Sequence, residues 1–317
     1  MSPFNESAPE IELPVTLESF SETREVPESR FIELAGILTH KGLELVKERF
    51  GDQENPKDHY HYHNQAHSEK AISRGESILK TARIGGMVIA DTDIALTRLI
   101  IARHDTVQEY RQKTDWPEGS DDAKYGRIFR ARFIGANEQA SIVEIWQEMQ
   151  RVNQEEGKTV FTRSDAQIAQ EAIRGTVPVW SLEQKTVIQP TITSESSLVA
   201  RAATLADLSE AGMTTESFTA SGNYLFLEEN LDMHGLDVAA LSDEEKTYYK
   251  KRMVKWLKDQ IDFAKGRKAM LAQETAGLPE TVRTLFDYFG RSIAFSQARA
   301  DIAEEQSFEE LYREMGF

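Results

Sequence analysis

Residues 94–105 of the 317-residue chain read IALTRLIIARHD, an apolar stretch that ends in two ionisable side chains. Its apolar residues fall on most sides of a helix, which predicts a central buried helix over about 92–104. His104 and Asp105 directly continue this stretch, where an isolated buried charge would cost several kcal/mol. Both side chains therefore need a partner, and a cation is a natural one. The alternative is that they lie at an exposed helix end.

Four of the seven histidines are crowded between His59 and His67. Neutral imidazole is a good ligand for transition metals, so this crowding suggests metal or phosphate chemistry. His63 and His67 share one face if a helix begins near Asn64, and that face continues with small or apolar residues through 71–82. His67 should therefore point into a helical bundle. The alternative is a polar loop that happens to be rich in histidine.

Asp207 lies in a third apolar segment, LVARAATLADLSEAG, at residues 198–212. At helical spacing it shares a face with small residues, which would let another helix or a metal site approach closely. The alternative is an ordinary surface aspartate. Taken together, three successive apolar segments offer two imidazoles and two carboxylates, from His67, His104, Asp105 and Asp207. Such a mixed site suits one divalent Mn, Fe, Zn, Ni or Mg ion, with coordination positions left open for water and substrate.

Between about residues 60 and 230 the sequence resembles the HD-domain superfamily of metal-dependent phosphohydrolases. Residues 62–67, YHNQAH, look like the YHNxxH box of one branch, and residues 101–105, IARHD, look like the HD box. Residues 137–141, NEQAS, are similar to a later Glu-x-x-Ser element, and Asp207 resembles the last metal aspartate. The resemblance implies an all-α fold, an HD-domain-like helical bundle with an additional C-terminal helical region.

The resemblance also implies a role for each matching residue. The metal ligands would be His67, His104, Asp105 and Asp207. His63 would be the general acid for the leaving oxygen, and Asp105 would be catalytic as well as a ligand. Glu138 would lie behind the ligands and orient one of them or a water, and Gln108 could contact substrate. No His occurs between His104 and His234, and Asn137 stands where related sequences often have His, which disfavours a second metal ion.

The expected function is the hydrolysis of a phosphoester by a metal-activated water. The substrate would be a nucleotide or another small phosphorylated metabolite. One alternative is a non-catalytic regulatory or interaction protein that binds a metal or a nucleotide on the same fold. Another is a helical interaction protein with no metal site. The Phe- and Tyr-rich C-terminal helices are compatible with a homo-oligomer.

Composition limits the other classes of function. The chain has no Cys, which excludes disulfides, thiolate metal sites and a cysteine nucleophile. Its formal net charge is −16 and no basic stripe is visible, so a nucleic-acid polymer is not expected as a partner. No apolar run approaches the roughly 18 residues of a membrane span, and the first residues show no secretory signal. We therefore expect a cytoplasmic protein that does not enter a membrane.

The chain is expected to form a tail and a helical body. Residues 1–27 are polar and contain proline, which predicts a disordered or loosely packed tail. Residues 28–235 would form the metal-binding HD-type domain, with residues 236–317 as helices packed on it. Helices are expected over about 29–50, 64–83, 92–104, 137–153, 165–174, 197–211 and 242–273. A long loop is expected at 106–133, and a short strand within 177–196. Glu228 and Glu229 are interpreted as surface charges.

Overall fold

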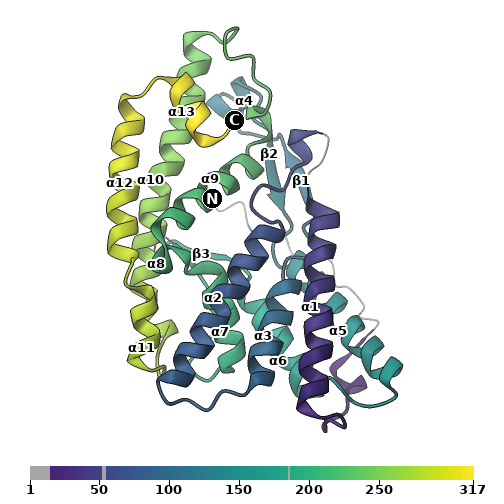
Figure 1. Cartoon of the computed structure of the whole chain (residues 1–317). Helices are drawn as coiled ribbons and strands as arrows, with labels where there is room; N and C mark the ends of the chain where they lie inside the picture. Colours follow the sequence, from purple (N-terminus) through teal and green to yellow (C-terminus); the bar gives the residue numbers. More distant parts are fainter. Residues whose placement is uncertain (1–14, 52–54, 185) are drawn as a thin grey trace.

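The computed structural model describes residues 15–51, 55–184 and 186–317. In these ranges the chain is mostly helical, which confirms the predicted all-α class (Figure 1). Its strands form two small antiparallel sheets. The described residues contain no helix that is both long enough and apolar enough to cross a membrane.

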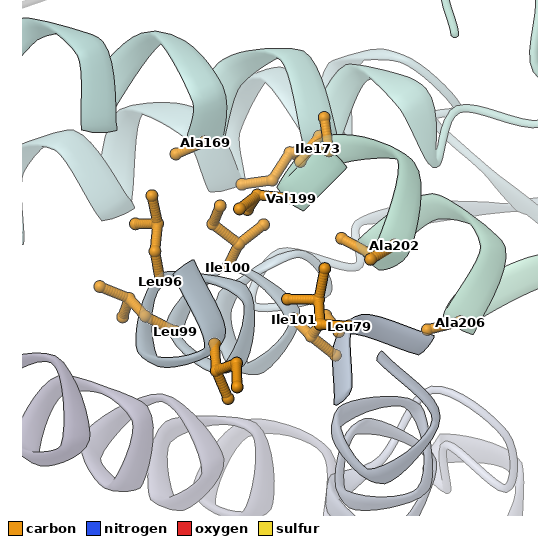
Figure 2. Close-up of a cluster of buried hydrophobic side chains, with 14 of the residues drawn as sticks. Leu79, Leu96, Leu99, Ile100, Ile101, Ala169, Ile173, Val199, Ala202 and Ala206 are labelled. Carbon is orange, nitrogen blue, oxygen red and sulfur yellow. The ribbon is translucent and has the colours of Figure 1, made fainter. Parts of the chain in front are cut away.

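The first two thirds of the chain supply the helices that the sequence predicts, to within a few residues at each end. They are α1 (Glu28–Phe50), α2 (Gln65–Ile84), α3 (Asp91–Arg103), α5 (Ala136–Glu156), α6 (Arg163–Gly175) and α7 (Leu198–Leu208). Helix α3 lies at the centre, in contact with α1, α2, α6 and α7. In Figure 2, Ile100 points toward Ile173 and Val199, and Ile101 lies on the side of Ala206. Every residue from Ile94 to Arg103 is buried except Arg98, which is exposed.

Residues 15–27 pack on the body of the protein, although the rest of the expected tail, residues 1–14, lies outside the described residues. After η1 (Leu17–Ser19), the Phe20 side chain is 2% exposed and its ring contacts that of Trp146. Arg24 donates two hydrogen bonds of 3.0 Å to the Asp165 carboxylate. A buried aromatic ring and an ion pair therefore attach residues 15–27 to the body of the protein.

Residues 106–133 are more regular than the loop that the sequence predicts. They contain an antiparallel pair, β1 (Tyr110–Lys113) and β2 (Phe129–Arg132), and a short helix α4 (Asp121–Lys124) between the two strands. The strands escaped prediction because each has only four residues and two of the four are charged. The expected strand within 177–196 is confirmed as one half of a hairpin, β3 (Val179–Ser181) with β4 (Thr186–Ile188).

After α7 the chain continues with α8 (Glu210–Met213) and α9 (Thr215–Glu229), and the second of these was not predicted. The C-terminal part contains α10 (Asp243–Glu274), α11 (Glu280–Arg283), α12 (Phe289–Glu305) and α13 (Phe308–Met315). Short 3-10 turns occupy η2 (Pro56–Asp58), η3 (Leu231–Met233) and η4 (Thr284–Phe286). Phe286 and Phe289 belong to the same core cluster as α3, while α10, α12 and α13 share a second cluster of buried side chains.

Candidate metal centre

Helices α2, α3 and α7 bring together the four residues predicted as metal ligands. The Asn64 side chain caps α2 by accepting the backbone N–H of His67 at 3.1 Å, which places His67 in the first turn. His104 is the C-cap of α3 and Asp105 follows it. Asp207 lies in the last turn of α7. His67, His104 and Asp105 are all 6% exposed or less, so the cluster is buried.

The ligating atoms of these side chains point at a common centre. His67 Nε2 lies 3.2 Å from Asp207 Oδ1 and 3.7 Å from Asp105 Oδ2. His104 Nε2 lies 3.0 Å from Asp105 Oδ2 and 3.6 Å from Asp207 Oδ1. Ligands held at about 2.1 Å from one ion at octahedral or tetrahedral angles lie roughly 3.0–3.4 Å apart. His67, His104 and Asp207 form a group that could hold a metal ion, and Asp105 faces the same point.

The hydrogen bonding of His104 fits a metal ligand. Its Nδ1 donates to the Ile101 carbonyl at 2.6 Å, which fixes the ring orientation and leaves Nε2 as the free lone pair of a neutral imidazole. Nε2 is buried and has no hydrogen-bond partner among the described residues. A lone pair that faces two carboxylates is unfavourable unless a proton or a cation lies between them. The donor set, two imidazole nitrogens and two carboxylate oxygens, suits a divalent ion of the Mn, Fe, Zn, Ni or Mg group.

Without a metal, a proton takes the place of the cation. Burial disfavours the charged imidazole of His104, but the Asp105 and Asp207 carboxylates raise its pKa well above the ordinary value. The His104 imidazolium in turn outweighs burial and lowers the pKa of Asp105 well below its ordinary value. The pKa of Asp207 is lowered in the same way by His104 and His67. A metal ion therefore has to displace a proton from His104.

Gln108 lies against one of the ligands. Its Nε2 donates to Asp105 Oδ1 at 2.8 Å, which leaves Oδ2 facing the two histidines. Gln108 is 3% exposed, and its Oε1 is buried without a hydrogen-bond partner in the described part of the chain. Gln108 thus orients Asp105, which is the kind of contact that holds a ligating carboxylate in place.

His63 lies next to the four ligands in a second buried cluster. Its ring centroid is 6.2 Å from that of His67, and the Tyr62 ring packs between them and contacts both. His63 Nδ1 lies 2.5 Å from Glu228 Oε1, and its Nε2 accepts a 2.8 Å hydrogen bond from Arg132 Nη1. His63 therefore carries its proton on Nδ1, with a carboxylate behind it and a guanidinium in front of it.

Glu228 was interpreted as a surface charge, and the structure shows that this is wrong. It is 1% exposed at the end of α9, and its Oε2 accepts the backbone N–H groups of Tyr62 and His63. Burial opposes its ionisation, but His63 and these backbone donors lower the pKa of Glu228 to about 2. Glu229 is half-buried, and burial together with the Glu228 charge raises the pKa of Glu229 to about 8.

Glu138 does not contact the four ligands in the described structure. Its Oε2 accepts the Gly135 backbone N–H at 2.5 Å at the start of α5, and its Oε1 lies 3.8 Å from Arg132 Nη2. Glu138 thus acts on the centre only through Arg132, which in turn contacts His63. Asn137 hydrogen-bonds the backbone of Glu109 through both ends of its amide, so it stabilises the chain beside β1 and is not a ligand.

Two cavities flank the site. One, of about 590 Å³, is lined by His67, Tyr62 and the basic side chains of Lys47, Lys70 and His61, among others. The other, of about 520 Å³, is lined by Gln108 and its neighbours. Phe50 and Tyr60 line both cavities and their rings are in contact, so they form the wall between them. Volumes of this size suit a small molecule.

Sequence reasoning missed Glu228, Arg132 and Arg74, which are the charged side chains closest to the predicted ligands. Arg74 lies in α2, is 7% exposed, and donates to the Ala206 carbonyl. Nothing in the local pattern distinguishes these residues from ordinary surface charges. The one available signal was the clustering of arginines at 127, 130 and 132 in an acidic chain.

Comparison of the chain with protein-family models found no match, and comparisons with curated proteins and with solved structures found none either. The function of this chain is therefore inferred from the residues and the geometry of the site.

Proposed function

We propose that this protein is a metal-dependent phosphohydrolase with an HD-type helical fold. One observation carries the proposal. The residues that match the HD boxes in chain order, His67, then His104 and Asp105, then Asp207, lie in or directly after three adjacent helices, and each histidine Nε2 lies 3.0–3.7 Å from an oxygen of both aspartates. A group with these donors and this burial has no simpler structural use, because it brings two carboxylates together in the core.

The residues fit a single divalent ion held by His67, His104, Asp105 and Asp207. When bound, such an ion lowers the pKa of a coordinated water and polarises a phosphoryl oxygen. Gln108 fixes the Asp105 carboxylate, and the Ile101 carbonyl fixes the His104 ring. These contacts keep the donors in place before substrate arrives.

His63 is proposed to move the proton to the leaving oxygen. The Glu228 carboxylate on Nδ1 stabilises a positively charged imidazole, which is the form that can donate from Nε2. In the structure Nε2 accepts from Arg132, so donation requires the Arg132 guanidinium to turn away from it. Glu138, 3.8 Å from that guanidinium, and the negative phosphoryl group of a substrate are the partners it can turn toward.

The substrate is proposed to be a small phosphorylated metabolite, and a nucleotide satisfies that description. The cavity of about 590 Å³ that reaches His67 accommodates a molecule of that size. The chain has a net charge of −16, so an anionic substrate needs local positive charge. Lys47 and Lys70 in the cavity wall provide it, whereas burial lowers the pKa of His61 in the same wall to about 4 and leaves that imidazole neutral.

The test is His63→Ala in metal-loaded protein, assayed on p-nitrophenyl phosphate, bis-p-nitrophenyl phosphate and a panel of nucleotides. Loss of a general acid should lower kcat by about 10²- to 10⁴-fold while metal content stays at the wild-type level. His40→Ala is the matched control, because His40 is exposed on α1, outside the site. If His63→Ala turns over as fast as the control, His63 does not have this role.

A second function, non-catalytic binding of a metal or a nucleotide for regulation, is favoured by one observation. The His63 atom that would donate the proton is engaged by a buried cation, Arg132. Metal-loaded wild type that hydrolyses none of the panel, yet binds one of its nucleotides, would support this second function over the first.

A further inference from the structure

Arg74 is a buried cation that joins the helix carrying His67 to the segment carrying Asp207. It lies seven residues after His67 in α2, so the two side chains share a face. Its Nε donates to the Ala206 carbonyl at 2.6 Å, and its Nη1 donates to Glu210 Oε1 at 2.7 Å. Arg74 and Glu210 are 7% and 5% exposed, so the pair lies inside the protein.

The two acceptors of Arg74 flank Asp207 in the sequence. Ala206 directly precedes it at the end of α7, and Glu210 begins α8 three residues later. One planar guanidinium therefore holds the chain on both sides of a proposed ligand, with donors in a rigid fork that a lysine does not have. This bridge joins the two elements that carry His67 and Asp207.

Neighbouring contacts leave α2 and Glu210 little freedom to shift. Gly75 follows Arg74, and a Cβ at this position would lie 2.7 Å from Ile101 Cδ1, so α2 is pressed against α3. Glu210 also accepts a hydrogen bond from Ser217 Oγ of α9, the helix that ends in Glu228. The pair thus connects three of the elements that build the site.

Stability alone is a weak reason for such a pair. A buried ion pair is often no more stabilising than apolar residues of the same volume. We propose that Arg74 and Glu210 are positioning residues whose task is to hold Asp207 opposite His67 and so to set the affinity of the centre for a divalent metal. The inference rests on the metal site of the proposed function, and it does not depend on hydrolysis.

The experiment compares Mn²⁺ binding to the full-length, metal-free wild type and to Arg74→Gln, by calorimetry and by the electron paramagnetic resonance signal of free Mn²⁺. Outer contacts of a ligand typically contribute about 10- to 100-fold in metal affinity, and a loss of this size is expected. Glu210→Gln should weaken binding in the same direction, and Arg74→Lys should fall between wild type and Arg74→Gln.

Arg252→Gln is the matched control. Arg252 pairs with Asp232, their side chains are 9% and 6% exposed, and Arg252 touches neither the proposed ligands nor residues 206–210, so its loss reports the general cost of breaking a buried pair. Its Mn²⁺ affinity should equal that of the wild type. Equal weakening in Arg252→Gln and Arg74→Gln would overturn the positioning role, as would wild-type affinity in both Arg74→Gln and Glu210→Gln. If Arg74→Gln does not fold, the Mn²⁺ affinities of Arg74→Lys and Glu210→Gln are compared with that of the wild type, and wild-type affinity in both would overturn the positioning role.

The outcomes separate this inference from the proposed function. Wild type that binds Mn²⁺, with weaker binding in Arg74→Gln and no turnover of any phosphoester, supports the positioning role and contradicts hydrolysis. Wild type that hydrolyses a phosphoester, with an Mn²⁺ affinity that Arg74→Gln does not lower, supports hydrolysis and contradicts the positioning role. Wild type that binds no Mn²⁺ would overturn both.

Discussion

Two buried groups of charges in this protein differ in whether the protein itself completes them. Arg267 donates from Nη1 and Nη2 to both oxygens of Glu274, at 2.8 and 2.6 Å, and further to the Val187 carbonyl and Ser209 Oγ. Each charge in this pair has its counter-charge within reach. At His67, His104, Asp105 and Asp207, by contrast, each histidine Nε2 lies within 3.7 Å of an oxygen of both carboxylates, and only a proton or a cation between them balances the two negative charges.

A structural ion pair and a binding site can be separated on this basis. The Arg267–Glu274 pair contains its own counter-charge, so breaking it should lower the stability of the protein. The centre at His67, His104, Asp105 and Asp207 is neutralised only by protons or by a metal ion, so its charge should depend on pH and on bound metal.

The largest effect is expected when the buried Arg267–Glu274 pair is broken. Arg267→Gln leaves the Glu274 carboxylate buried without its partner, which should lower the free energy of unfolding by about 3–5 kcal/mol. Urea unfolding of the metal-free variant and wild type measures the loss. The double variant Arg267→Met with Glu274→Leu should recover most of it, because it leaves no buried charge. A loss of only about 0–1 kcal/mol in the single variant would mean that the pair behaves like an exposed one.

A smaller effect is expected from pH at Glu228, the carboxylate behind His63. Its pKa is about 2 in the folded protein against an ordinary value of 4.5, so the folded state binds fewer protons there than the unfolded state. The stability that ionised Glu228 contributes is therefore present above pH 4.5 and is lost as the pH falls toward 2.

Glu228→Gln removes this contribution. The wild type should be more stable than the variant at neutral pH, and the difference between their free energies of unfolding should shrink as the pH falls from about 5 to about 3. Urea titrations of metal-free protein at several pH values give the comparison. A difference that stays constant over that range would show that Glu228 does not ionise as its contacts indicate.

The central helix and the proposed ligands could be predicted because each lies in a regular pattern. The run before His104 is apolar on most sides, with Arg98 exposed, so ionisable residues that directly continue it had to lie either at an exposed helix end or in a site. Asn64 is a good N-cap, and it placed His67 in a first turn that faces the core. The order of the ligands along three apolar segments then suggested that they converge.

The surroundings of the site could not be predicted, because they depend on contacts between distant segments. Glu228 follows Leu227 in an unpredicted helix, and only tertiary packing brings it to His63, 165 positions earlier in the chain. Arg132 lies on a strand of only four residues, two of which are arginines, so the sequence did not indicate a strand there. Arg74 resembles any arginine on an amphipathic helix, whose charge normally reaches water.

The proposed function depends above all on a metal ion at His67, His104, Asp105 and Asp207. The direct measurement is the metal content of purified full-length protein after incubation with Mn, Fe, Zn, Ni or Mg and removal of excess ion, for wild type beside Asp105→Ala. We predict about one ion per chain in the wild type and none in the variant, because Asp105 supplies a ligating carboxylate. If the wild type retains no ion under any of these conditions, or if Asp105→Ala retains as much as the wild type, the proposed metal site is wrong.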